Sequence, residues 1–326
     1  MPSGGSVAIG GVTARPYPGS AHRGASRRAQ TRVIDVPWPM TKSVVVTGAN
    51  SGIGLATSLH LAEHGYDVIG TVRSAEKADL VAAASAERGV DVRTVVCDVT
   101  SAASTTVAFD AIAAMTGGGP WAVVNNAGVS QPGAVEDVTD EDARYQLEVN
   151  VLAPARIARL VLPSMRARGD GRIVMMSSIA GRVSVPMLGW YSASKHALEA
   201  LSDSLRSEVA GFGVRVVLIE PGSFNSSIWS SAGTRMPEPT AAYGPAYERA
   251  WQIAAHRGPG LADPVWVARA VRLALASPVP LARYLVGGDA MIGAALDAMV
   301  PTMLVDYAKS VAVGLRRWPW ATASGR

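Results

Sequence analysis

The chain has 326 residues and a formal net charge of +4, and 48% of its residues are hydrophobic against 17% charged. This composition excludes a disordered chain, and the single cysteine, Cys97, excludes both a disulfide framework and a cysteine-based zinc site. No stretch reaches the roughly 18 consecutive apolar residues of a membrane-spanning helix, and the five histidines show no metal-ligand spacing. We therefore expect neither a transmembrane segment nor a metal.

The positive charge is confined to the N-terminal segment. Residues 1–39 hold five of the 30 basic and one of the 26 acidic residues, so residues 40–326 are balanced at 25 of each. This balance predicts no nucleic-acid partner. The segment has neither periodicity nor an apolar signal core, which predicts a disordered N-terminal extension. Two alternatives stay open: the segment is an upstream extension before a natural start at Met40, or it is a transit peptide. We expect a cytoplasmic protein. A chain that begins at Met40 should fold and should turn over substrate like the full chain.

Strands and helices alternate from residue 43 onward. Strands are expected at Val44–Val46, Val68–Val72, Val92–Val96, Ala122–Asn125, Ile173–Ser177, Val214–Ile219 and Tyr284–Val286. Helices are expected at residues 52–64, 76–88, 101–115, 140–168, 191–210 and 264–276, with irregularities at Pro154 and Pro163. The strands are short and rich in Val and Ile, as buried parallel strands are. The pattern predicts an α/β fold: a single Rossmann-type, doubly wound parallel sheet of about seven strands with helices on both faces.

A glycine-rich loop connects the first strand to its helix. It reads Thr47-Gly48-Ala49-Asn50-Ser51-Gly52-Ile53-Gly54. Gly48 permits a tight turn, Gly52 permits close approach of a pyrophosphate, and Gly54 permits close helix packing. The helix N-terminus that follows offers free N–H groups to phosphates, and Ser51 adds a hydroxyl donor. The strand–turn–helix context therefore favours a dinucleotide site over an ordinary turn.

Three further motifs fall at the ends of later strands: Cys97-Asp98-Val99, Asn125-Asn126-Ala127-Gly128 and Pro221-Gly222. A fourth, Tyr191-Ser192-Ala193-Ser194-Lys195, opens the helix expected at 191–210. With the glycine loop, they resemble the motifs of the short-chain dehydrogenase/reductase family from about Met40 to Gly288. The resemblance implies cofactor contacts at Thr47, Gly48, Asn50, Ser51, Gly52, Ile53, Gly54, Asp98, Val99, Asn126, Ala127, Gly128, Tyr191, Lys195, Pro221 and Gly222. Ser226 stands where the family places a threonine that bonds the nicotinamide carboxamide.

The end of the second strand indicates which nicotinamide cofactor binds. An acidic residue there would bond the ribose 2′-hydroxyl of NAD. This chain has Arg73 instead, whose planar guanidinium suits a 2′-phosphate. The nearest acids, Glu76 and Asp79, fall within the next helix. We expect NADP(H) to be preferred, with NAD(H) possible.

Tyr191 and Lys195 are four residues apart and share one face of a helix. Carbonyl reduction needs a proton donor, and a nearby ammonium lowers the pKa of a tyrosine that serves as one. The resemblance implies that Tyr191 is the general acid or base and that Lys195 also holds the nicotinamide ribose. It implies that Ser178 bonds the substrate oxygen and that Asn150 holds a water of the proton relay.

Substrate specificity is expected from three segments: the apolar stretch Arg182–Trp190, a partly helical lid at about 223–261, and a helical C-terminal segment at about 289–317. The lid carries Phe224, Trp229, Met236, Tyr243, Tyr247 and Trp251. Few charges fall in the lid except Arg235, Glu238, Glu248 and Arg249, which favours a bulky apolar alcohol or carbonyl over a phosphorylated sugar. The long C-terminal segment resembles the 17β-hydroxysteroid and retinol dehydrogenase branch. A 3-oxoacyl thioester or xenobiotic carbonyl reductase, and a non-catalytic NADP(H)-binding regulator, stay open. The family implies a homodimer or homotetramer.

Overall fold

The computed structural model describes residues 42–226, 228, 233–257 and 261–316. The expected N-terminal extension and Trp229 lie outside these residues. Seven strands form one sheet: β1 (Ser43–Thr47), β2 (Asp67–Val72), β3 (Val92–Val96), β4 (Ala122–Asn125), β5 (Gly171–Met176), β6 (Val214–Pro221) and β7 (Arg283–Val286). All neighbours pair in parallel, in the order β3-β2-β1-β4-β5-β6-β7. This confirms the predicted doubly wound sheet.

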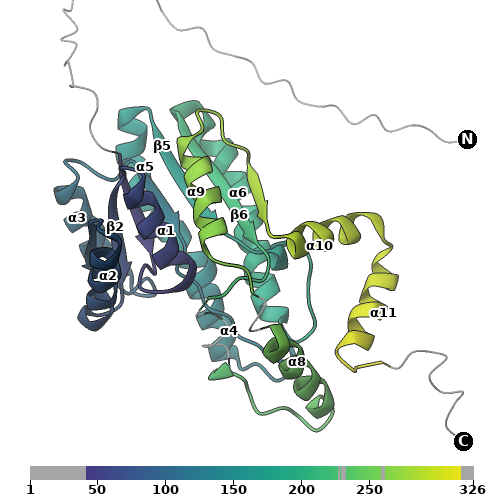
Figure 1. Ribbon diagram of the computed structural model, residues 1–326. Coiled ribbons are helices and arrows are strands. Elements are labelled where there is room, and N and C mark those ends of the chain that lie inside the picture. Colours follow the sequence, from purple (N-terminus) through teal and green to yellow (C-terminus); the bar gives the residue numbers. More distant parts are fainter. Residues whose placement is uncertain (1–41, 227, 229–232, 258–260, 317–326) are drawn as a thin grey trace, which may run out of the picture. The chain divides into compact units, whose positions relative to one another are not determined.

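The helices are α1 (Gly52–Glu63), α2 (Ala75–Arg88), α3 (Ala102–Met115), α4 (Asp140–Leu147), α5 (Ala153–Arg168), α6 (Gly189–Val209), α8 (Gly244–Arg257), α9 (Val265–Ala276), α10 (Gly288–Met299) and α11 (Thr302–Ala312). Short turns of helix lie at η1 (Glu148–Leu152), η2 (Ile179–Gly181) and η3 (Ala210–Phe212). Figure 1 shows α1 and α9 side by side on one face of the sheet, where they pack together. None of the helices in the described ranges is long and apolar enough to cross a membrane.

The hydrophobic core has two parts because successive side chains of a strand point to opposite faces. Val45 joins the cluster that includes Ile112 of α3, Ile157 of α5 and Leu198 of α6. Its neighbours Val44 and Val46 join the cluster formed with α1, α2 and α9. Helices on both faces of the sheet therefore bury both sides of its central strands. This explains why these strands are continuous apolar runs in the sequence.

The single long helix expected at 140–168 is interrupted. A π-helical turn, η1, separates α4 from α5, and Asn150 lies inside it. Neither proline causes this break, since Pro154 lies in the first turn of α5 and Pro163 inside it. Pro154 is tolerated there because the first N–H groups of a helix need no intrahelical partner.

The strand order reverses between the parallel neighbours β1 and β4: β2 and β3 are added on the side of β1, and β5 to β7 are added on the side of β4. Ligands of doubly wound sheets bind at the carboxyl ends of the strands near this point. The glycine loop after β1, the Asn-Asn-Ala-Gly segment after β4 and the Ser177-Ser178 segment after β5 all end there. The fold therefore gathers the predicted motifs at one edge.

Candidate active site

The glycine loop has the geometry of a phosphate cradle. Gly48 and Gly52 have φ values of +68° and +52°, which side chains rarely adopt. A Cβ at Gly54 would lie 2.1 Å from the Gly48 carbonyl oxygen, so only glycine permits α1 to pack this closely. The first hydrogen bond of α1 runs from Leu55 N–H to Ser51 O, and no side chain caps the helix. The N–H groups of its first turn thus remain available to an anion.

Thr47 lies beneath this cradle. Its buried Oγ1 accepts hydrogen bonds from the N–H groups of Asn126 (3.0 Å) and Ala127 (2.9 Å), and it does not line the pocket. Its predicted cofactor contact stays a prediction, while its hydroxyl has a structural role. Thr47 holds the segment after β4 against β1, because its side chain satisfies two backbone donors that the strand has left behind.

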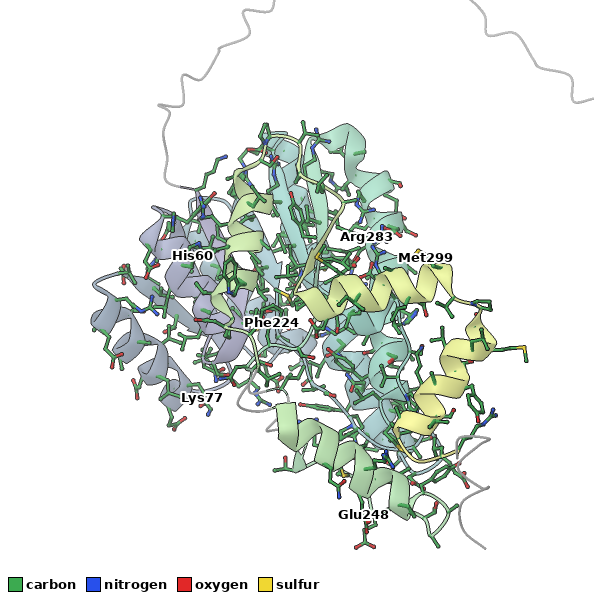
Figure 2. All side chains as sticks on the ribbon, turned by 45° about the vertical axis from the view of Figure 1, so that its right-hand side comes forward. His60, Lys77, Phe224, Glu248, Arg283 and Met299 are labelled. Carbon is green, nitrogen blue, oxygen red and sulfur yellow. The ribbon has the colours of Figure 1, made fainter. Side chains whose placement is uncertain are left out.

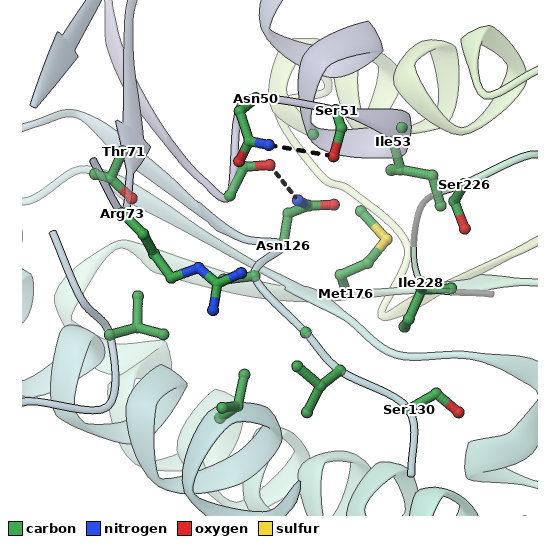
Figure 3. A pocket seen from close by; sticks show the side chains of 18 of the residues that line it. Asn50, Ser51, Ile53, Thr71, Arg73, Asn126, Ser130, Met176, Ser226 and Ile228 are labelled. Carbon is green, nitrogen blue, oxygen red and sulfur yellow. Dashed lines mark hydrogen bonds between the residues drawn. The ribbon is translucent and has the colours of Figure 1, made fainter. Parts of the chain in front are cut away.

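One pocket runs along the carboxyl ends of the strands. Of the predicted residues it is lined by Gly48, Asn50, Ser51, Gly52, Ile53, Gly54, Arg73, Asp98, Val99, Asn126, Ala127, Gly128, Ser178, Tyr191, Lys195, Pro221, Gly222 and Ser226. Figure 3 shows Arg73 reaching into it from the end of β2, on the side opposite Ser226 and Ile228. The length and lining of this groove fit an extended dinucleotide with its phosphates at the glycine loop.

The groove carries two cations at the end where β2 and β3 terminate. Arg73 makes no hydrogen bond or ion pair with any described residue, and Lys77 of α2 lines the same end. Sequence analysis missed Lys77, although its position four residues after Arg73 was visible. Glu76 does not line the pocket, and a hydrogen bond from Ser74 lowers its pKa. This end of the groove therefore carries two cations, Arg73 and Lys77, against one lining carboxylate, Asp98.

Tyr191, Lys195 and Ser178 come together at the other part of the groove. Tyr191 is buried at the start of α6 and is hydrogen-bonded to Ser178. The Lys195 Nζ atom lies 5.7 Å from the centroid of the Tyr191 ring and donates to Met176 O at 2.8 Å. Ser178 Oγ also accepts from Ala180 N–H at 3.1 Å, which fixes its position at the start of η2. The arrangement places a hydroxyl donor, a phenol and an ammonium around one point.

Burial dominates the electrostatics of this group. It lowers the pKa of Lys195 to about 8, against the opposing effect of Glu199 one turn later. Burial also raises the pKa of Tyr191, while the Ser178 hydrogen bond acts in the opposite direction. The net direction for the Tyr191 pKa is upward, because desolvation disfavours the phenolate. The expected lowering of this pKa by Lys195 stays a prediction.

Asn150 supports the group from behind and does not line the pocket. Its Nδ2 donates to Val129 O and to Ser194 Oγ, both at 3.0 Å, and its Oδ1 accepts from Val129 N–H at 2.9 Å. The side chain thus fastens the segment after β4 to α6. Its predicted relay role stays a prediction.

The substrate side of the pocket agrees with the expectation in part. Ile228 and Arg235 of the expected lid line it, together with Val129, Ser130 and Tyr145, whereas no described residue of the Arg182–Trp190 segment or of the C-terminal helices does. In the lid, Phe224 is a core residue, and α8 packs on Met187. Tyr247 Oη donates to Asp137 at 2.9 Å and accepts from Ala134 N–H at 2.9 Å. These aromatic rings attach the lid to the body. Figure 2 shows Met299 at the outer end of α10, where it is exposed.

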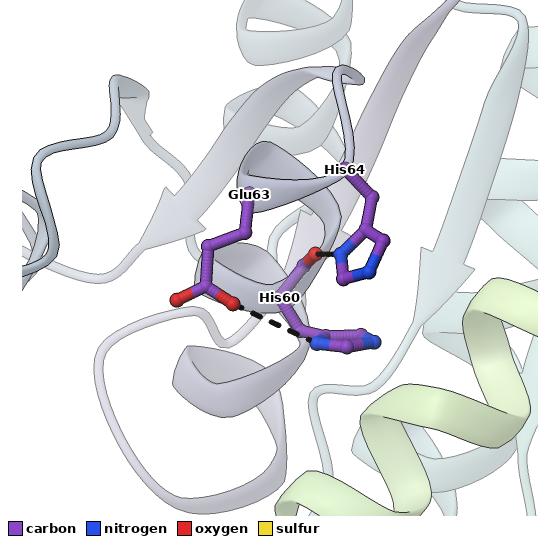
Figure 4. A group of neighbouring side chains, drawn as sticks. All are labelled: His60, Glu63 and His64. Atoms are coloured by element: carbon purple, nitrogen blue, oxygen red, sulfur yellow. Dashed lines mark hydrogen bonds and ion pairs between the residues drawn. The ribbon is translucent and has the colours of Figure 1, made fainter.

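Three side chains at the C-terminal end of α1 and just after it form a cluster outside the groove. His60, Glu63 and His64 can each offer one ligand atom, with these atoms within 4.8 Å of one another (Figure 4). These three residues are spaced more like the ligands of a metal site than the sequence analysis indicated. However, Glu63 is paired with Arg88 at 2.9 Å, and the charges of Arg272 and Arg269 help burial to lower the pKa of His60. We assign no metal to this cationic surrounding.

Comparisons with known proteins agree with this geometry. Residues 42–236 match the model of the short chain dehydrogenase family. An uncharacterized oxidoreductase of Bacillus subtilis, YusZ, is 36% identical over 76% of this chain and 89% of its own length. The NADPH-dependent 3-dehydrocapnine reductase of Ornithobacterium rhinotracheale is 39% identical over 58% of this chain and 67% of its own. Human retinol dehydrogenase 16 is 33% identical over 81% of this chain and 86% of its own.

Solved structures with this fold hold the expected class of cofactor. A short-chain dehydrogenase from Streptomyces avermitilis is 35% identical, with a TM-score of 0.70 over 84% of this chain and 98% of its own. An alcohol dehydrogenase from Thermococcus sibiricus, complexed with 5-hydroxy-NADP, is 26% identical, with a TM-score of 0.62 over 76% of this chain and 96% of its own. A short-chain dehydrogenase/reductase from Burkholderia phymatum in complex with NAD is 27% identical, with a TM-score of 0.69 over 78% of this chain and 92% of its own. The chain belongs to the short-chain dehydrogenase/reductase family and is an oxidoreductase with a nicotinamide dinucleotide cofactor.

Proposed function

We propose that this enzyme uses NADP(H) to interconvert a ketone or aldehyde and the alcohol of an apolar, steroid-, retinoid- or lipid-like substrate. The observation that carries the proposal is the buried Tyr191, hydrogen-bonded to Ser178 and followed one turn later by Lys195, on the same groove as the glycine loop. A silent cofactor-binding protein would not need this group.

The bound reduced cofactor supplies a hydride to the carbonyl carbon. Tyr191 gives its phenolic proton to the carbonyl oxygen, so that the products are the alcohol and the oxidised cofactor. Ser178 donates a hydrogen bond to the oxygen on which negative charge develops. Lys195 stabilises the phenolate that Tyr191 becomes, and with a pKa of about 8 it exchanges protons near neutral pH. Oxidation of the alcohol reverses each transfer, with Tyr191 as the base.

The ammonium of Lys195 has three donors, and the Met176 carbonyl accepts from one of them. The others are available to the ribose hydroxyls of the cofactor. Asn150 lies in the π-helical turn next to α6 and is proposed to hold the relay water that returns the proton from solvent. Ser226 is proposed to bond the nicotinamide carboxamide from the loop after β6.

NADP preference is supported by Arg73 and Lys77 at the end of the groove and by the absence of an acid at the end of β2. The NADPH-dependent relative and the NADP-type ligand of the archaeal enzyme agree with it. Each charge-assisted hydrogen bond to a phosphate contributes on the order of 1.5–3 kcal/mol. We therefore expect Arg73→Ser and Lys77→Ser each to lower the ratio of kcat/KM for NADPH over NADH by about tenfold.

The matched control is Arg88→Ser, which removes the same charge from the C-terminal end of α2, where Arg88 pairs with Glu63. It should leave the cofactor ratio unchanged. A wild-type enzyme that turns over NADH better than NADPH, or an unchanged ratio in both groove variants, would contradict the assignment.

The substrate class is supported by relatives named for the reduction of 3-dehydrocapnine and the oxidation of retinol. Cofactor turnover should be measured with a panel of long-chain ketones, retinoids, steroids, 3-oxoacyl thioesters and hydrophilic sugars. We expect the apolar ketones to give the highest kcat/KM. Activity confined to thioesters would select the alternative reductase, and activity confined to sugars would overturn the apolar substrate.

We also infer a homodimer or homotetramer, which the family commonly forms through helices equivalent to α5 and α6. Analytical ultracentrifugation at micromolar concentration measures the number of subunits. A monomer under these conditions would contradict the inference. We also propose that the protein is located in the cytoplasm. Fractionation of cells, with the protein followed in each fraction, tests this location.

A further inference from the structure

Arg235 lies in the part of the lid that crosses the catalytic side of the pocket. Its carbonyl oxygen accepts a hydrogen bond from Gln131 Nε2 at 2.6 Å. The backbone N–H of Gln131 donates to Gln146 Oε1 at 2.6 Å, and Gln146 Nε2 donates to Ser194 Oγ at 3.5 Å. Ser194 Oγ in turn donates to Tyr191 O at 2.7 Å. A continuous set of hydrogen bonds thus connects the Arg235 backbone to the first turn of α6.

The guanidinium of Arg235 has a defined seat inside the pocket. It lies 4.7 Å from the centroid of the Tyr145 ring, and its Nη2 donates to Tyr145 Oη at 3.5 Å. Both side chains line the pocket and both are partly buried. A guanidinium held against an aromatic ring in this way keeps its remaining N–H donors available for an anion.

No acid neutralises Arg235 among the residues that the structure describes. Asp98 is the single carboxylate of the pocket lining, and it lies at the end of β3, on the other part of the groove. Among the described residues none of the acids in or beside the lid forms an ion pair with Arg235: Glu238 is exposed, and Glu136 and Asp137 accept hydrogen bonds from Tyr243 and Tyr247. A partly buried cation without a counterion is costly until an anion arrives.

We propose that Arg235, seated on Tyr145, binds an anionic group, a carboxylate or a phosphate, on an otherwise apolar substrate. This proposal rests on the proposed oxidoreductase function and refines it: the substrate is an amphiphile whose charged end lies under the lid while its carbonyl meets Tyr191 and Ser178. The apolar part of the substrate has Val129 and Ile228 as neighbours in the same lining.

The first test compares oxo fatty acids, with the ketone at carbons 4 to 8, with their methyl esters, which differ only in charge. We expect the wild-type enzyme to have a KM about ten- to a hundredfold lower for the best acid than for its ester, as a charge-assisted hydrogen bond provides. Arg235→Gln should abolish this difference by raising the KM of the acid, with the ester KM and the NADPH Kd unchanged. Arg235→Lys should restore part of it.

The matched control is Arg249→Gln, which removes an exposed charge from α8 of the same lid outside the pocket lining. It should leave every constant unchanged. Equal KM values for acid and ester in the wild type would overturn the proposal. So would an equal loss for both substrates in Arg235→Gln, which would indicate a purely structural lid residue. A weaker NADPH Kd in this variant would reassign Arg235 to the cofactor phosphates.

A second measurement separates this proposal from the oxidoreductase function. Calorimetric titration of the NADP-loaded enzyme with dodecanoate and with its methyl ester needs no turnover. We expect the acid to bind at least tenfold more tightly, and only when Arg235 is present. Tight binding of the acid without reduction of any ketone would refute the proposed reaction and support the anion site. Turnover of neutral ketones without binding of the acid would support the reaction and refute the anion site.

Discussion

Replacing Gly54 by alanine tests the glycine loop most sharply, because the structure gives the size of the clash. The new Cβ would lie 2.1 Å from Gly48 O and 2.5 Å from Asn126 Nδ2. Real Cβ contacts begin at 3.0 Å, so α1 and the loop would have to separate by roughly 1 Å. The oxygen is backbone and cannot swing away, which places the cost at the upper end of overpacking, about 3 kcal/mol.

Alanine also has an intrinsic advantage in a helix of about 1 kcal/mol over glycine. The net loss of stability is therefore about 2 kcal/mol, which corresponds to a fall in Tm of roughly 4–8 °C for a domain of this size. The same displacement moves the N–H groups of α1 away from the phosphates. We expect the NADPH Kd, measured by fluorescence titration, to rise at least tenfold.

Gly211→Ala is the matched control, because a Cβ at Gly211 meets no atom within 4 Å and its φ lies outside the left-handed region. It should leave both Tm and Kd unchanged. If Gly54→Ala has wild-type Tm and binds NADPH with wild-type affinity, the close approach of Gly54 to Gly48 does not form the cofactor site.

Two further substitutions probe the catalytic group and the lid. Lys195→Met removes a buried cation whose pKa falls to about 8 from an ordinary value of 10.5. Between these values the unfolded chain binds more protons, so this lysine makes wild-type stability rise with pH from about 8 to 10.5. With the lost hydrogen bond to Met176 O taken into account, we expect Lys195→Met to be about 1–2 kcal/mol more stable than wild type at pH 7. The stability of the variant should not rise between about pH 8 and 10.5. Urea titrations at several pH values measure both free energies of unfolding, and parallel dependence on pH in the two proteins would refute this prediction. Tyr247→Phe leaves the buried Ala134 N–H without its acceptor and Asp137 without its donor, so the lid should weaken by about 1–3 kcal/mol. Substrate KM should rise several-fold with an unchanged NADPH Kd, and an unchanged KM would show that the Tyr247 hydroxyl does not hold the lid.

The sheet and most of the cofactor groove follow from local patterns. Short Val-rich strands alternate with helices, and the cofactor motifs fall directly after strands, so parallel pairing brings these motifs to one edge. The tight turn predicted at Gly48 and the close helix packing predicted at Gly54 are confirmed, because glycine spacing encodes backbone geometry directly. The approach of a pyrophosphate to Gly52 stays a prediction. Tyr191 and Lys195 were placed together because a helix sets their separation.

Other features depend on contacts that the sequence does not display. The π-helical turn at Asn150 has no compositional signal that separates it from the α-helix around it. Thr47 was expected to contact the cofactor, but its hydroxyl is consumed by two backbone donors about 80 residues away in the chain. Arg235 reaches the catalytic side through Gln131, more than 100 residues earlier, so no local pattern could assign it. The lid and the C-terminal helices follow tertiary packing in the same way.

The central claim is that Tyr191 transfers the proton while the dinucleotide groove holds NADP(H). Single-turnover reduction of a long-chain ketone by enzyme-bound NADPH, followed at 340 nm in wild type and in Tyr191→Phe, measures this step alone. We expect the phenylalanine variant to lose at least about a hundredfold in rate while its NADPH Kd stays within twofold of wild type. A variant that reduces the ketone at the wild-type rate would show that another group delivers the proton.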